Sequence, residues 1–274
     1  MKKILLAFTA ITLLFTACKK EDDPAAEKWY LTKLIDVYGE RKDTTFVSWH
    51  PDNTLKEFNY SFLYNGAPAF NAFLPVYEGG KITGIQMRTQ NRPVAHTITS
   101  FVYTGNLVTS AENQAYDQDL ADWVINSRDS LVYAGGKLAE LYVKYRNGST
   151  TFYKLTWEGD NVKRCDISSK QQDTEFIPYQ TINYTYDTKP AFHRLVNNNY
   201  QWLADVSNFK YLSANNLLKS QMIRQPEGTL ELTTTNVFTY DDDNLLKAVD
   251  TKVEMVYPEA RVEDYKTIME YTKR

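Results

Sequence analysis

The side chains that could perform chemistry are few in this 274-residue chain and lie far apart in sequence. The histidines are His50, His96 and His193, and no pair has zinc-motif spacing. No Gly-x-Ser-x-Gly segment is present to hold a nucleophilic serine. We therefore predict no catalytic residue, no metal site, no cofactor and no enzymatic activity. A hydrolase whose scattered carboxylates are assembled by folding is an alternative, because their separation in space cannot be deduced from sequence.

Two loop motifs resemble ligand-binding loops. Gly135-Gly136 follows an apolar, aromatic segment, as a phosphate-binding loop would, but such a loop must lead into a helix. The residues after Gly136 alternate between apolar and polar, so a second strand is expected there instead. Asp241-Asp242-Asp243-Asn244 offers oxygens to calcium, but equivalent loops contain Glu-Gly-Gly-Lys. We interpret both motifs as turns.

The N-terminus has the pattern of an export signal. Lys2 and Lys3 precede a short apolar run, and small residues then precede Cys18. This pattern resembles a lipoprotein signal, which implies cleavage before Cys18 and acylation of its thiol and new amine. Two or more acyl chains give stable anchoring. An ordinary cleaved signal that leaves Cys18 as a free thiol is the alternative.

The segment after Cys18 is charged, lacks aromatics and contains Pro24, which predicts a solvated tether. We assign residues 1–17 to the signal peptide, 18–28 to the lipidated cysteine and tether, and 29–274 to one domain. Cys-Lys-Lys-Glu-Asp-Asp also resembles the export tag of surface lipoproteins in Bacteroidota-type bacteria. That resemblance implies an outer-membrane lipoprotein at the cell surface, with the periplasmic face as the alternative.

The composition of the chain bears on its partners, its cysteines and its secondary structure. The net charge is −3 and basic residues are dispersed, so no nucleic-acid partner is predicted. Once Cys18 is acylated, Cys165 has no intramolecular partner, and we expect it to be a buried small residue rather than a nucleophile. The chain holds 20 tyrosines and 13 phenylalanines, which favour strands.

A degenerate repeat organises the domain. An aromatic residue, four loop residues and an aliphatic residue recur in "VYEGGKITGI", "VYAGGKLAEL", "TWEGDNVKRC" and "TYDDDNLLKA". With looser copies, the recurring aromatics are Trp49, Tyr77, Tyr103, Tyr133, Trp157, Tyr186, Tyr211 and Tyr240. A period of this size indicates a recurring supersecondary unit, here a β-hairpin. Asn147-Gly148 and Pro226-Glu227-Gly228-Thr229 predict turns at the opposite end of the sheet, and residues 266–271 the last strand.

The repeat therefore predicts an all-β fold, an antiparallel up-and-down meander of about sixteen strands. Tyr240-Asp241 and Tyr186-Asp187, each followed by turn residues, resemble the YD hairpin repeats of Rhs-type shell proteins. Most of residues 30–274 also resembles uncharacterised Bacteroidota lipoproteins built from such hairpins. These resemblances imply a fold and a location but no activity.

The sheet must bury its apolar face. We expect it to coil or to form two packed layers. A porin-like barrel is the alternative, but the charges on both strand faces argue against it. Two segments interrupt the rhythm, residues 111–129 and 190–208, and the second has helical spacing. These inserts either cap the sheet or bind a ligand.

We predict a membrane-anchored, non-catalytic binding or surface module for a glycan or an outer-membrane protein partner. A structural scaffold or shell component is the alternative. The candidate ligand-binding residues are Trp123, Tyr200 and Trp202, because they lie in the two irregular segments. The alternative for these residues is that they pack into the core.

Overall fold

The computed structural model describes residues 28–196 and 207–274, except residue 258. Within these residues it contains sixteen antiparallel strands that form one closed barrel, which confirms the predicted all-β meander. The strands are β1 (Trp29–Tyr38), β2 (Arg41–Trp49), β3 (Leu55–Tyr64), β4 (Ala67–Glu78), β5 (Lys81–Thr89), β6 (Arg92–Thr104), β7 (Leu107–Asp117), β8 (Asp122–Ala134), β9 (Lys137–Tyr145), β10 (Thr150–Glu158), β11 (Asn161–Lys170), β12 (Ile177–Pro190), β13 (Asn215–Arg224), β14 (Thr229–Tyr240), β15 (Leu246–Met255) and β16 (Arg261–Lys273).

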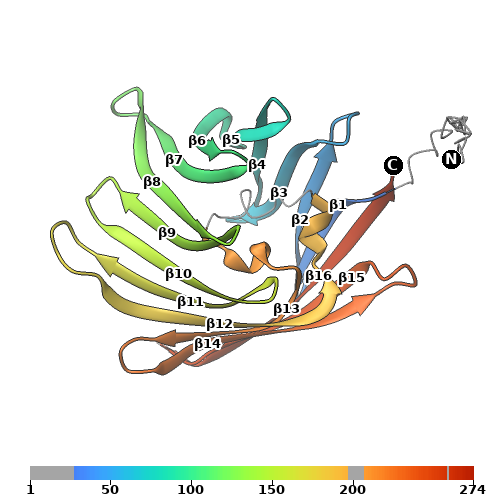
Figure 1. Cartoon of the computed structure of the whole chain (residues 1–274). Coiled ribbons are helices and arrows are strands. Elements are labelled where there is room, and N and C mark those ends of the chain that lie inside the picture. The colour runs from blue at the N-terminus through green and yellow to red at the C-terminus, as the bar shows by residue number, and fades with distance from the viewer. Residues whose placement is uncertain (1–27, 197–206, 258) are drawn as a thin grey trace, which may run out of the picture.

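Each strand pairs with the next along the chain, and β1 pairs with β16 to close the barrel (Figure 1). β1 therefore starts, and β16 stops, at the same end of the barrel. We call this the terminal end and the opposite one the distal end. The Gly135-Gly136 turn lies at the terminal end, and the turn after Asn147 lies at the distal end.

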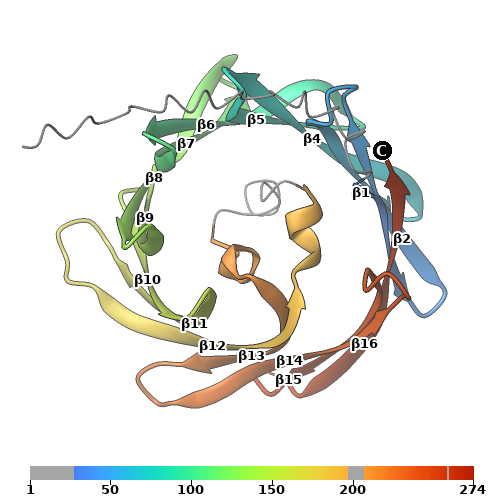
Figure 2. The same cartoon turned by 45° about the vertical axis from the view of Figure 1, so that its right-hand side comes forward.

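Of the two expected arrangements, the sheet coils on itself, here into a closed barrel, and does not form two packed layers. Pairing of β1 with β16 leaves the described sheet without a free edge, and a closed barrel needs no second layer to protect edges. The apolar side chains are instead buried inside the barrel. They pack there against the β12–β13 connection, whose described part lies within the ring of strands (Figure 2).

The glycine pairs reverse the chain, as predicted. Gly135 and Gly136 have φ values of +58° and +79°, and they join β8 directly to β9. Two successive positive φ values are the requirement of a type I′ hairpin turn, which glycine meets at little steric cost. The turn at Asn147-Gly148 joins β9 to β10, and the turn at 225–228 joins β13 to β14, also as predicted.

The repeated aromatic residues are cross-strand braces at the terminal end. Five of them, and also Tyr271 of β16, donate a hydrogen bond from the ring hydroxyl or indole nitrogen to a backbone carbonyl on the preceding strand. The pairs are Trp49–Leu31, Tyr77–Leu55, Tyr103–Ile82, Tyr133–Val108, Trp157–Leu138 and Tyr271–Leu246, at 2.6–3.0 Å. In most pairs the acceptor is the aliphatic residue of the preceding repeat copy. The aromatic position of the repeat thus supplies the donor, and the aliphatic position supplies the backbone acceptor.

A register shift accompanies the repeat. The ladder slips by one residue immediately before the aromatic in each even-numbered strand from β2 to β14. Such a β-bulge redirects the side chain that follows it. The aliphatic partners, including Leu55 and Val162, are fully buried. The expectation that Tyr211 belongs to this series was wrong, because Tyr211 lies in a 3-10 helix and not at a strand end.

The two expected inserts differ. The segment 111–129 is regular, since β7 and β8 pair through it with a four-residue loop. The prediction of an irregular insert there was therefore wrong, because the longer strands only delay the turn. The second segment does interrupt the meander after Pro190. Its described parts include the 3-10 helices η1 (Phe192–Val196) and η2 (Phe209–Leu212).

Candidate functional site

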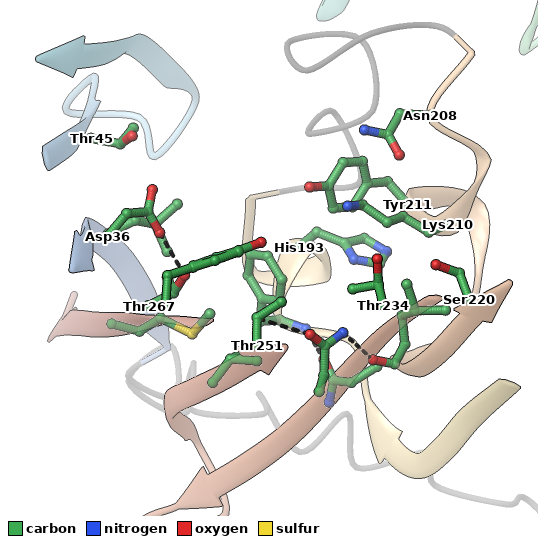
Figure 3. A pocket seen from close by; sticks show the side chains of 18 of the residues that line it. Asp36, Thr45, His193, Asn208, Lys210, Tyr211, Ser220, Thr234, Thr251 and Thr267 are labelled. Atoms are coloured by element: carbon green, nitrogen blue, oxygen red, sulfur yellow. Dashed lines mark hydrogen bonds between the residues drawn. The ribbon is translucent and has the colours of Figure 1, made fainter. Parts of the chain in front are cut away.

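A cavity of about 570 Å³ lies inside the barrel, between the β1–β4 wall, the β12–β16 wall and the η1–η2 connection (Figure 3). Its size is within the range of small-molecule sites. Phe58, Phe73, Met222 and Phe238 contribute apolar walls. Tyr38, which is 41% exposed and ends β1 at the distal end, lies on its lining. We refer to this space as the luminal cavity.

A belt of polar side chains crosses the wall of the luminal cavity. Asp36, Thr267, Thr251, Asn236, Thr234 and Ser220 come from five strands that are consecutive around the barrel, and all six line the cavity. The hydroxyl of Thr267 donates to Asp36 Oδ1 at 2.5 Å, and that of Thr251 donates to Asn236 Oδ1 at 2.8 Å. We call these six residues the polar belt. They form a continuous surface of hydrogen-bonding groups.

The opposite side of the luminal cavity is formed by the β12–β13 connection. Lys210, Tyr211 and Asn208 lie together there, and Figure 3 shows them on the other side of the view from Asp36 and Thr267. The ammonium nitrogen of Lys210 lies 4.9 Å from the ring centre of Tyr211. The pKa of Lys210 is raised by the neighbouring phenols of Tyr211 and Tyr265, against the opposing effect of burial. Lys210 is therefore a cation at neutral pH.

The connection is held firmly to both walls. Phe209 of η2 is fully buried and packs edge-to-face on Tyr153 of β10 at 5.3 Å. Ser213 Oγ accepts a 3.0 Å hydrogen bond from the backbone of Val162. η1 contacts β1 while η2 contacts β11. The described connection therefore spans the lumen and fixes the position of Lys210.

His193 and Asp36 have pKa values shifted mainly by burial. The His193 ring is buried against Tyr211, with ring centres 5.5 Å apart, and burial lowers its pKa to about 4. It is thus neutral at physiological pH. Burial also raises the pKa of Asp36, against the lowering effect of its Thr267 hydrogen bond. Among the described residues, the lining of the luminal cavity includes one lysine, Lys210, and one carboxyl side chain, Asp36, on its two sides.

The candidate residues from the sequence have different positions. Trp123 starts β8 at the distal end, where it packs edge-to-face on Tyr116 at 5.8 Å and does not line the luminal cavity. Tyr200 and Trp202 lie outside the described residues, as does Cys18. Cys165 is fully buried, and burial raises its pKa to about 12, so it is no nucleophile at neutral pH.

Sequence reasoning missed the polar belt. Its members are ordinary strand residues, and only the register of five consecutive strands brings them together. One signal was available: Asn236 and Asp36 occupy alternating positions at which the repeat otherwise has apolar side chains. Lys210 was not predicted, because the segment that begins at Lys210 and Tyr211 was interpreted as a looser copy of the hairpin repeat.

Among the described residues, no group of three or more histidine, cysteine or acidic side chains has the arrangement of a metal site. No helix in the described chain is long and apolar enough to cross a bilayer.

The described chain folds as a closed, sixteen-stranded antiparallel barrel, and comparison with solved structures finds proteins of similar fold. The chain is similar to a porin-like protein from Bacteroides uniformis, with a TM-score of 0.55 and 13% identity over 88% of this chain and 96% of that one. It is also similar to a porin-like protein from Bacteroides vulgatus, with a TM-score of 0.52 and 12% identity over 89% and 99%. At these identities the likeness is one of fold.

No described protein family matches the sequence. No curated protein matches it either.

Proposed function

We propose that this protein is an exported, non-catalytic binding module, tethered to the outer membrane by lipid on Cys18, whose barrel stands in water rather than in the bilayer. The observation that carries the proposal is the distribution of charge between the two barrel faces. A bilayer-spanning barrel has an apolar band facing outward and a polar interior. In the present barrel, ion pairs lie on the outer face, and the main buried cluster is apolar.

Side chains alternate between the two faces along each strand. The exposed fractions of two successive residues therefore show which of them faces outward. In β8 the side chain of Asp129 is 1% exposed and faces inward, whereas that of Arg128 is 64% exposed and faces outward. Arg128 pairs with Glu112, the central residue of β7, at 2.9 Å. The outer face therefore carries an ion pair at mid-height of the barrel.

Further outward ion pairs lie around the barrel. They are Lys33–Glu270, Arg88–Glu57, Arg164–Asp166 and Lys266–Asp250, at 2.7–3.2 Å. A lysine or arginine on the lipid face near the bilayer centre costs about 2–4 kcal/mol. Several such residues would make insertion strongly unfavourable. In water, exposed ion pairs of this kind are contacts of small energy.

The interior supports the binding part of the proposal. The buried cluster includes Leu31, Leu141, Val162 and Phe209, so the terminal half of the lumen is packed rather than open. The described β12–β13 connection also lies inside the ring (Figure 2). A general diffusion channel needs a continuous aqueous path, which this packing opposes. A lumen that is packed in one half and carries the luminal cavity is better suited to holding a ligand, a glycan being the class predicted from the sequence.

The membrane part can be tested with Cys18→Ser in the native host. Wild-type protein should fractionate with the outer membrane, and the variant should be released as a soluble folded protein. The matched control is Cys165→Ser, which removes the only other thiol and should leave wild-type fractionation unchanged. If Cys18→Ser stays in the membrane and requires detergent for extraction, the proposed tether is wrong.

A further inference from the structure

We infer that the luminal cavity binds an acidic sugar, a polyhydroxylated ring that carries a carboxylate, with Lys210 receiving the carboxylate and the polar belt receiving the hydroxyl groups. This inference rests on the proposed binding function and adds the location and chemical class of the ligand. It moves the binding site from the predicted aromatic residues to the inside of the barrel.

The polar belt is suited to a ligand with several hydroxyl groups. Ser220 and Thr234 are register partners on β13 and β14, and their hydroxyls make no hydrogen bond to any described residue. A hydroxyl both donates and accepts, so each can pair with a hydroxyl of a ligand in either sense. Tyr184, the register partner of Ser220 on β12, extends the same row. Such a row selects for ligands with matching polar groups.

An acyl chain is a poorer occupant. Burying the hydroxyls of Ser220 and Thr234 against hydrocarbon would deprive them of water without a replacement partner, which costs free energy for each group. A site built around hydroxyl groups discriminates strongly against analogues that lack them. The apolar rings of Phe58, Phe73 and Phe238 are compatible with a sugar, because pyranose faces expose C–H groups that pack on aromatic surfaces.

Lys210 favours an acid over a neutral sugar. Among the described residues no carboxylate forms an ion pair with its ammonium group, and its cavity neighbours include Tyr211 and Asn208. A carboxylate placed there would form a charge-assisted hydrogen bond, which is about twice as strong as a neutral one. Across the cavity, Asp36 would instead accept hydrogen bonds from sugar hydroxyls with its second oxygen, since Oδ1 is held by Thr267.

The volume sets the size of the bound unit. About 570 Å³ accommodates a small ligand but not a long chain. A polysaccharide would therefore enter by its end, past Tyr38 at the distal end. The bound acidic sugar is therefore either a free monosaccharide or the terminal residue of a polysaccharide. A binding experiment can distinguish the two ligands.

The experiment is a calorimetric titration of the soluble domain from residue 28 onward with D-glucuronic acid, D-glucose and a tetrasaccharide ending in glucuronic acid. Glucuronic acid should bind at least about tenfold more tightly than glucose, as expected for one charge-assisted hydrogen bond. A tetrasaccharide that binds more tightly than the monosaccharide would identify a chain end as the source, and equal affinity would identify the free sugar. Dodecanoate serves as the amphipathic anion without hydroxyls.

Variants at two positions, Lys210 and Ser220, locate the site. Lys210→Met should remove the preference for glucuronic acid over glucose, and Lys210→Arg should keep it. Ser220→Phe, which fills the luminal cavity from a different strand, should abolish binding of both sugars. Trp123→Ala is the matched control, because it changes an aromatic at the distal end outside the cavity and should bind like wild type.

The inference is overturned if glucuronic acid does not bind, if dodecanoate binds more tightly, or if Trp123→Ala loses binding while Ser220→Phe keeps it. These outcomes leave the proposed tether intact, since fractionation of Cys18→Ser does not depend on the ligand. Conversely, a protein that fails the fractionation test but shows the predicted sugar preference would retain the luminal site.

Discussion

Asp36 and Asp43 lie directly opposite each other across the β1–β2 ladder, and both side chains face the lumen. They differ in their partners. Asp43 is 1% exposed and accepts hydrogen bonds from Arg41 Nε at 3.0 Å, Arg41 Nη2 at 2.6 Å and Tyr60 Oη at 3.0 Å. Asp36 has Thr267. One carboxylate is thus enclosed by donors, which favours a structural role for it over catalysis.

Removing the guanidinium should destabilise the barrel. Arg41→Met leaves the Asp43 carboxylate buried without its bidentate partner, although Arg41 itself is half-exposed and solvent screens part of the interaction. We expect a loss of about 1–2 kcal/mol in the free energy of unfolding, measured by urea denaturation. Lys252→Met is the control, because it breaks a surface pair with Glu254 and should have a much smaller effect. Equal effects of the two variants would show that Asp43 does not depend on Arg41.

Asp36→Asn should make the protein more stable at neutral pH. The pKa of Asp36 is raised in the folded state, chiefly by burial. Between the unfolded and the folded pKa the folded state therefore binds more protons, and this residue makes stability fall as pH rises. The amide has no such charge to bury, so the gain should appear above the folded pKa and vanish at lower pH. Urea midpoints at neutral and acidic pH test this, and a variant less stable at neutral pH would contradict it.

His193 gives the opposite pH dependence. Its pKa falls from 6.5 to about 4 on folding, so between these values only the unfolded state binds the proton. Stability should therefore decline by about 3 kcal/mol in total as pH falls through this window. His193→Gln should be less sensitive over the same range. If the wild type and the variant lose stability in parallel between pH 6.5 and 4, His193 is not the buried neutral group described above.

The aromatic braces should contribute to stability through their hydrogen bonds. The Tyr133 hydroxyl donates to the Val108 carbonyl at 2.9 Å, and Tyr133→Phe leaves that acceptor without its partner. We expect a loss of about 1–2 kcal/mol. Tyr64→Phe, at a 66% exposed position at the distal end, is the matched control and should change stability by under about 0.5 kcal/mol. Unfolding midpoints that coincide for both variants would contradict the role of the brace.

The hairpin architecture could be predicted from sequence because its signals are local. The turn at Gly135-Gly136 and the alternation after it lie within one short segment, and each repeat copy carries them again. The closure of the sheet could not be predicted in the same way. It depends on pairing of Leu34 with Met269, residues at opposite ends of the domain, and no local pattern specifies that contact.

The candidate site was less predictable than the fold. Trp123 was a predicted ligand-binding residue because it lies in a segment expected to be an insert, but that position belongs to β8. The polar belt depends on the register of several ladders, and a shift of one residue in any of them would turn Thr234 or Ser220 outward. Lys210 enters the lumen only because the β12–β13 connection folds inward. The strand register and the path of the connection are features of the tertiary structure, and local sequence patterns do not specify them.

The central claim is that the barrel stands in water, and sedimentation of residues 28–274 in detergent-free buffer tests it most directly. The outward pairs Arg128–Glu112 and Lys266–Asp250 predict a soluble, monodisperse and folded protein that does not associate with added phospholipid vesicles. A domain that aggregates without detergent, and that inserts into vesicles as a folded barrel, would contradict the account.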